Sequence, residues 1–152
     1  MKTLSKFIIT IVATLALAGC KNMTPQQQAI TQDAAQVGVT SAAMAATALV
    51  VRNNPQSVPD FQAGQVVLNQ LAGSGMGLST NNIQAILAQE NVTNPAVATV
   101  ISAAVLTVTP FLDSITNVVE QQQILHESFT WASTGIVFGI PLGQALASSK
   151  QP

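Results

Sequence analysis

Acid–base chemistry in this sequence would have to come from a few carboxylates and one histidine. His126 precedes Glu127, but neighbouring residues on a helix point about 100° apart, so these side chains do not converge on one substrate. Asp113 and Glu120 are seven positions apart, which places them on one helical face about 10 Å from each other. A carboxylate pair can cleave glycosidic bonds, yet two single acids on such a stripe are more typical of a solvated face. We predict that the protein is not an enzyme.

The sequence also offers few residues for a metal site or for nucleophilic catalysis. A metal site needs three or four converging ligands, whereas the acidic residues are scattered singly along the chain. A Ser–His–Asp arrangement would have to use His126, and nothing places that histidine near a nucleophile. We predict no catalytic residue, no metal site and no bound cofactor other than covalent lipid.

The composition restricts the partners. Of 152 residues, 7% are charged and 48% are hydrophobic, whereas a typical soluble domain is about 25% charged. Beyond residue 19 the basic residues are Lys21, Arg52 and Lys150, against six acidic ones. Nucleic-acid binding depends on basic patches, so we expect no nucleic-acid partner. The high apolar fraction also argues against a disordered chain.

The N-terminus has the organisation of an export signal. Lys2 and Lys6 precede a short apolar run that ends in Leu17-Ala18-Gly19-Cys20. This run is too short to remain as a bilayer-spanning helix. The four-residue motif resembles the lipobox of bacterial lipoproteins. The resemblance covers about 20 residues and implies that residues 1–19 are a signal peptide.

The resemblance also implies a lipid anchor on Cys20. In lipoproteins this thiol receives diacylglycerol and the new amine is usually acylated, which gives a stable hold on the bilayer. Cys20 is the only cysteine, so no intramolecular disulfide can form. In enteric bacteria an Asp after the lipidated cysteine retains the protein in the inner membrane. Lys21 stands at that position here, so we expect an outer-membrane lipoprotein facing the periplasm.

The remaining chain has helical patterns and no sustained period of two, which predicts an all-α bundle of four to five helices, with a membrane-associated C-terminal hairpin as an alternative for its last segment. Residues 20–28 are expected to be a tether, 29–149 the helical domain and 150–152 a tail. The first helix, over 29–52, carries a row of large residues beside a row of small ones. We expect it to pair antiparallel with a long helix from Pro95 to Leu125, bent or broken near Thr109 because of Pro110. The rows are Ile30, Val37, Met44 and Val51, and Ala34, Ser41 and Ala48.

A glycine row marks the last segment. Gly135, Gly139 and Gly143 recur every four residues within residues 128–149, which contain no charge. Such a row lets two helices approach closely, as membrane helices do. The segment faintly resembles the glycine-zipper segments of some outer-membrane lipoproteins, although Pro141 departs from that pattern. The alternative that we favour is a buried C-terminal hairpin in which the glycines form turns.

These features predict an envelope protein held on the lipid bilayer through Cys20. Its expected role is structural, through contact with another envelope protein or with itself. The alternative is a membrane-active factor of the pore, lysis or exclusion type, which would insert the uncharged segments 91–112 and 128–149. A third possibility, an apolar ligand inside the bundle, has no convergent polar group in its favour.

Overall fold

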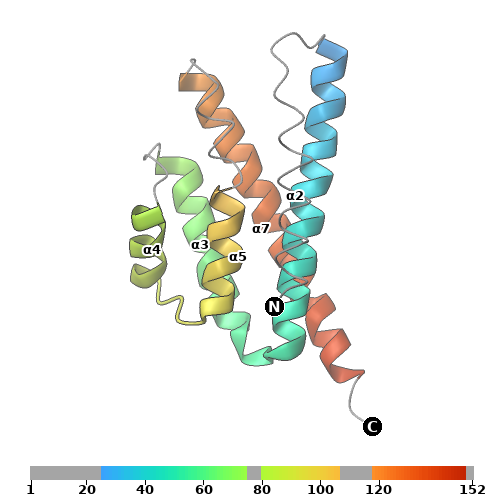
Figure 1. Ribbon diagram of the computed structural model, residues 1–152, viewed down its shortest axis with the longest axis vertical. Helices are drawn as coiled ribbons and strands as arrows, with labels where there is room; N and C mark the ends of the chain where they lie inside the picture. The colour runs from blue at the N-terminus through green and yellow to red at the C-terminus, as the bar shows by residue number, and fades with distance from the viewer. Residues whose placement is uncertain (1–24, 75–79, 107–117, 150–152) are drawn as a thin grey trace.

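The computed structural model describes residues 25–74, 80–106 and 118–149, and within these ranges the chain is entirely helical with short connections (Figure 1). Five α-helices and one short 3-10 helix are present, with no strand among the described residues. The predicted all-α bundle is confirmed. The signal peptide, Cys20 and the tail lie outside the described residues.

Helix α2 (Pro25–Asn53) begins four residues earlier than the predicted start at residue 29. Proline is favoured in the first helical turn because its missing N–H has no partner there in any case, and the glutamines that follow are good helix formers. The helix therefore includes residues 25–28 of the segment expected to be a tether.

Of the predicted rows on α2, Val51 and Ala48 are buried, whereas the described row residues before Met44 are exposed. Val37 is 65% exposed, and Ala34 and Ser41 are exposed as well. The buried row is instead Ala43, Thr47 and Val51, with Ala48 beside it. Alanines surround this helix, so the heptad spacing alone did not distinguish which row faces a neighbour.

A short 3-10 helix (Pro55–Ser57) turns the chain into α3 (Val58–Ser74), and α4 (Thr80–Gln89) follows. Asn91 ends α4 in the left-handed region with φ of 57°, and the Val92 N–H donates to the Leu87 carbonyl at 2.9 Å. This is the hydrogen bond of a Schellman cap, which usually places glycine or asparagine at the left-handed position.

Helix α5 (Pro95–Leu106) starts where predicted, with the Asn94 side chain accepting a hydrogen bond from the Ala96 N–H at 2.9 Å. The helical run predicted from Pro95 to Leu125 is expected to be bent or broken near Thr109, and residues 118–125 belong to a separate helix, α7 (Val118–Ser148), which agrees with a break. The apolar spacing continues across Pro110, and spacing cannot distinguish one bent helix from two separate ones. The expected break near Thr109 falls outside the described residues.

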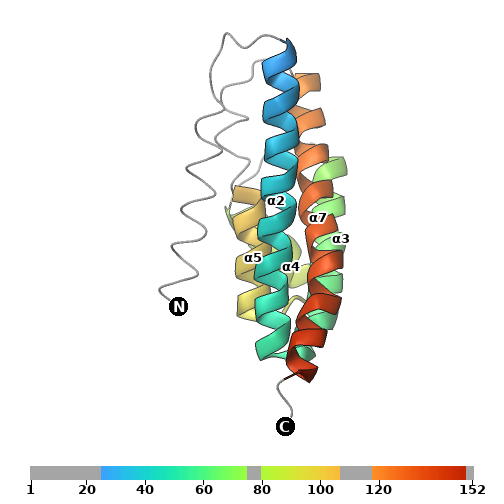
Figure 2. The same ribbon diagram turned by 90° about the vertical axis from the view of Figure 1, so that its right-hand side faces the viewer.

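The long pair of the bundle is α2 with α7, rather than α2 with the helix from Pro95. Both helices run in the same direction, whereas α3 and α5 run the opposite way (Figures 1 and 2). The prediction that the helix from Pro95 is the main partner of α2 is therefore wrong, although α5 does contact α2 and runs antiparallel to it. In Figure 2 α2 and α7 lie side by side toward the viewer, in front of the other helices.

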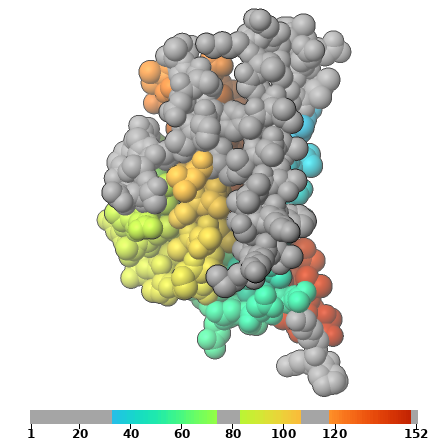
Figure 3. All heavy atoms as spheres, viewed as in Figure 1, coloured from blue at the N-terminus to red at the C-terminus, as the bar shows by residue number. Residues whose placement is uncertain are grey.

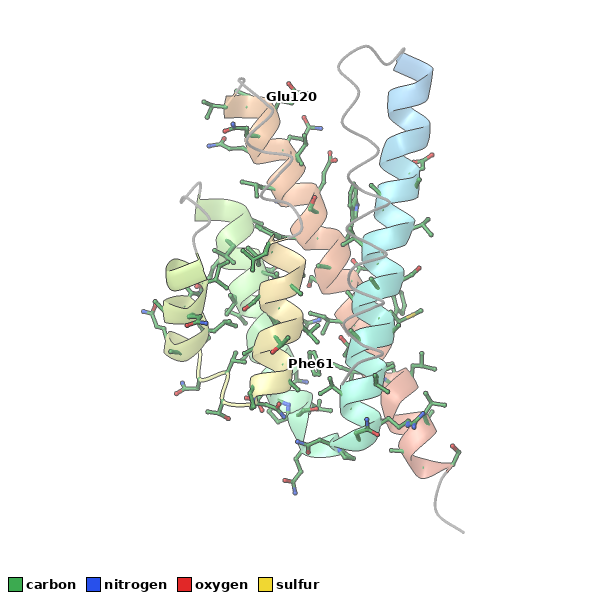
Figure 4. The ribbon with its side chains drawn as sticks, in the orientation of Figure 1. Phe61 and Glu120 are labelled. Carbon is green, nitrogen blue, oxygen red and sulfur yellow. The ribbon has the colours of Figure 1, made fainter. Side chains whose placement is uncertain are left out.

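The apolar core lies between this pair and the layer of α3, α4 and α5. Phe61 of α3 has no exposed surface and lies among these helices, whereas Glu120 stands at the far end of α7 (Figure 4). Burying such a side chain contributes roughly 1.5–3 kcal/mol. The other large, fully buried side chains are Leu68, Ile83, Ile101, Phe129 and Ile136.

Candidate functional site

The three glycines of α7 lie directly against the backbone of α2. A Cβ atom added to Gly139 would be 2.6 Å from both the Met44 carbonyl oxygen and the Thr47 Cβ. A Cβ on Gly143 would be 2.7 Å from the Ala48 carbonyl oxygen and from the Val51 Cβ. No side chain fits in these places, so glycine permits the close approach of the two helices.

The contact keeps a constant register. Gly135 opposes Ala43, Gly139 opposes Thr47 and Gly143 opposes Val51, and each pair is separated by 92 positions. A constant separation means that the two helices run parallel, with one row of four-residue spacing against another. The Thr40 hydroxyl extends this register by donating to the Trp131 carbonyl at 3.4 Å.

The predicted C-terminal hairpin is wrong for the described residues. The glycines are not turns, because Val118–Ser148 is one continuous helix that includes Pro141. Proline removes one backbone hydrogen bond, and its exposed position leaves room for its ring on the outer side of α7. The prediction of close helix packing at Gly135, Gly139 and Gly143 agrees with their geometry.

The contact has a buried flank and an exposed flank. Phe129 and Ile136, on one side of the glycine row, are each 1% exposed and lie in the core. Phe138 and Leu142 each follow a glycine by three residues, so they project on the opposite side of the row. They are 58% and 42% exposed, respectively.

On α2 the corresponding flank carries Val37 and Met44. Core residues Val39, Ala46 and Val50 lie on the other flank of the contact row. Because α2 and α7 are parallel and face each other, the flank of α2 opposite its core flank lies on the same side of the pair as the flank of α7 that carries Phe138 and Leu142. We call the resulting surface the uncharged face, and it is formed by Val37, Met44, Trp131, Phe138 and Leu142.

The charges of the α2–α7 pair lie at its two ends. With the separation of 92 positions, Asp33 and Glu127 lie near one end, where Figure 4 also places Glu120. Arg52 lies at the other end, level with Gln144. Between these levels both helices are free of charge over about 25 Å, at 1.5 Å per residue. The uncharged face lies within this band.

Hydroxyl groups on the outer side of α7 form bonds within their own helix. Thr130 donates to the His126 carbonyl at 2.7 Å, Thr134 to the Thr130 carbonyl at 2.8 Å, and Ser148 to the Gln144 carbonyl at 2.9 Å. This bonding to the carbonyl four residues back satisfies the hydroxyl proton without a solvent molecule. The outer side of α7 is therefore less polar than its composition indicates.

The candidate acid–base residues do not form a site among the described residues. The His126 side chain is exposed, and Glu127 accepts a hydrogen bond from Gln123 Nε2 at 2.9 Å. Glu120 is exposed at the start of α7, and Asp113 lies outside the described residues. Within the described ranges no three His, Cys, Asp or Glu side chains come together as a metal site would require.

Sequence reasoning found the glycines but missed their partners on α2 and the uncharged face. The available signal was the four-residue spacing of Ala43, Thr47 and Val51, which matches the glycine spacing. Because alanines occur at so many positions of α2, that spacing was hidden among equivalent rows.

Comparison with known proteins does not assign this bundle to a family: no family model, no curated protein and no solved structure matches the chain. Among the described residues, one helix could cross a membrane by length and composition alone, over Asp33–Asn53, and 28% of its apolar window is buried in the bundle. A core helix of a soluble protein passes the same test. The functional argument therefore rests on the residues themselves.

Proposed function

We propose that this protein is a lipid-anchored protein of the bacterial envelope, held to a membrane by acylated Cys20 and acting through contact with another envelope protein or with itself. The observation that carries the proposal is the distance between the lipobox and the bundle. Helix α2 begins at Pro25, five positions after Cys20. Five extended residues span at most about 18 Å, so the anchor would hold the first turn of α2 close to the membrane surface.

The surface proposed for a protein partner is the amide-rich side of α3 and α4. Helix α4 forms the edge of the bundle farthest from α2 (Figures 1 and 3). Exposed amide side chains supply both hydrogen-bond donors and acceptors without charge, which suits a protein interface. The exposed amide residues here are Gln62, Asn69, Gln70, Gln84 and Gln89.

A membrane-active role is the second candidate, because α2 has the length and composition of a membrane-spanning helix. For this role we propose other inserting segments than 91–112 and 128–149. The described helix within segment 91–112 is the 12-residue α5, which rises about 18 Å against a hydrocarbon core of about 30 Å. Inserting segments would therefore be α2 and α7, whose close contact through glycines resembles the packing of membrane helices.

The anchor is tested by replacing Cys20 with serine in the full chain, in a bacterial host that processes lipoproteins. The wild-type chain is expected to incorporate labelled fatty acid and to fractionate with membranes. The Cys20→Ser variant should lose the label and the shift in mass due to processing. A Ser149→Cys variant of the Cys20→Ser chain controls for acylation of any available thiol. Equal labelling of wild type and Cys20→Ser would contradict the proposal.

A further inference from the structure

We infer that the uncharged face of the α2–α7 pair is a second membrane contact, which lies along a lipid bilayer with the two helix axes parallel to the membrane surface. This inference rests on the proposed lipid anchor, which would hold the start of α2 at the bilayer. It goes further, because an anchored domain can equally project away from the membrane on its tether.

The first argument is the distribution of charge. Asp33, Glu120 and Glu127 lie toward one end of the pair and Arg52 at the other, so the face between them holds no ionised group. A helix that lies in the membrane interface buries an apolar side by about 5–10 Å and keeps its charges in water. The α2–α7 pair has this arrangement.

The second argument is the size and exposure of the side chains. Val37, Phe138 and Leu142 are 65%, 58% and 42% exposed, and they occupy one side of the pair together with Met44 and Trp131. A cluster of large exposed apolar side chains marks a surface that is covered in the working molecule. Tryptophan is also favoured at membrane interfaces, because its ring is apolar and its N–H remains near water.

The position of the anchor favours lipid over a protein partner. Cys20 lies five positions before the start of α2, the helix that carries Val37 and Met44. An acylated Cys20 would therefore hold the uncharged face beside the bilayer.

The protein supplies its own probe, because Trp131 is the only tryptophan and there is no tyrosine. The full chain is produced in bacteria, and the processed protein is purified from membranes and reconstituted into phosphatidylcholine vesicles. Some vesicles carry lipids brominated near the headgroup, and others carry lipids brominated near the chain end. We expect headgroup-side bromines to quench Trp131 fluorescence strongly. We also expect the emission maximum of Trp131 to shift to shorter wavelength.

A second chain moves the probe to the middle of the uncharged band by combining Trp131→Phe with Phe138→Trp. With the helices parallel to the surface, positions 131 and 138 lie at similar shallow depth, so headgroup-side bromines should quench both. Quenching of position 138 mainly by chain-end bromines would overturn the inference, because it shows helices that cross the bilayer.

Matched substitutions test the face itself. Leu142→Lys places a charge on the uncharged face, whereas Leu106→Lys does so at a leucine of α5 that is 40% exposed, compared with 42% for Leu142. The first should weaken the vesicle contact about tenfold, measured as the loss of Trp131 quenching. The second should leave quenching unchanged. Circular dichroism confirms that both variants keep the helical content of the wild type.

Two further outcomes would overturn the inference. Unquenched, red-shifted Trp131 fluorescence in vesicles would show that the face is in water. Unquenched, blue-shifted fluorescence together with a dimer in light scattering would show that a second copy covers the face. Neither outcome alters the labelling of Cys20, so failure of this inference and failure of the proposed anchor are distinguishable.

Discussion

The glycine contact makes a sharp prediction for Gly139→Ala. In the interior of a helix, replacing glycine with alanine normally stabilises by about 1 kcal/mol, because alanine has less backbone freedom to lose. At Gly139 the new methyl group would lie 2.6 Å from the Met44 carbonyl oxygen and from the Thr47 Cβ, whereas ordinary contact begins at 3.4 Å. The two helices would have to separate by roughly 0.8 Å at this point.

Extra atoms in a closely packed interior destabilise by about 1–3 kcal/mol. Because backbone and Cβ atoms cannot rotate out of the way, we place Gly139→Ala in the upper part of that range before the gain in propensity is subtracted. The free energy of unfolding should then fall by about 1–2 kcal/mol. Gly38→Ala is the matched control on α2, since nothing lies within 4 Å of its added Cβ. This variant should gain up to about 1 kcal/mol.

The assay is equilibrium denaturation of the two variants in mild detergent, followed by circular dichroism and by the fluorescence of Trp131. The same substitution should thus have opposite signs at two helical glycines. The expected difference of about 2–3 kcal/mol corresponds to melting temperatures roughly 5–10 °C apart. If Gly139→Ala is as stable as Gly38→Ala, the close approach of α2 and α7 is not present in the protein and the register derived from it is wrong.

Other predictions concern single polar groups. Thr47 is fully buried and its hydroxyl has no hydrogen-bond partner, so Thr47→Val should raise the free energy of unfolding by about 1 kcal/mol in denaturation curves. Asp60 accepts hydrogen bonds from the Thr93 N–H at 2.7 Å, the Thr93 hydroxyl at 3.2 Å and the Asn94 N–H at 3.3 Å. Asp60→Ala should therefore cost about 1–2 kcal/mol, and Asp60→Asn less, because it keeps the accepting oxygen. Asn91→Ala should lower the melting temperature, at a cost of about 1 kcal/mol, whereas Asn91→Gly should not, because glycine adopts the left-handed conformation without strain.

The fold class, the start of α5 and the end of α2 could be predicted because they depend on local chemistry. Asn94 before Pro95 is a cap followed by a first-turn proline, and the structure begins α5 there. The turn residues Asn53, Asn54 and Pro55 likewise end α2 where expected. These signals act within a few residues, so the sequence alone contains them.

The pairing of helices could not be predicted in the same way. Val37 and Met44 repeat at heptad spacing, which predicts that both are buried against a neighbouring helix, yet Val37 is 65% exposed. Whether this row or the row of Ala43, Thr47 and Val51 is buried depends on the helix that packs against α2. The contacting residues of that helix are 92 positions away in the sequence. For the same reason helix packing was only one of two alternatives for the glycines, turns were favoured, and their partner helix was missed.

The parallel arrangement of α2 and α7 also has a consequence for how the chain folds. The contacts that join them connect residues 92 positions apart, so they close a very long loop and form late. Helices α3, α4 and α5 lie between the two in sequence, and the contacts among these three close shorter loops, so they are expected to form before the contacts with α7. During synthesis or export from the N-terminus, α2 would lack its main partner until the C-terminal helix emerges. A chain stopped before residue 135 would leave the backbone of α2 uncovered at Ala43, Thr47 and Val51, and such exposed apolar surface is prone to aggregate.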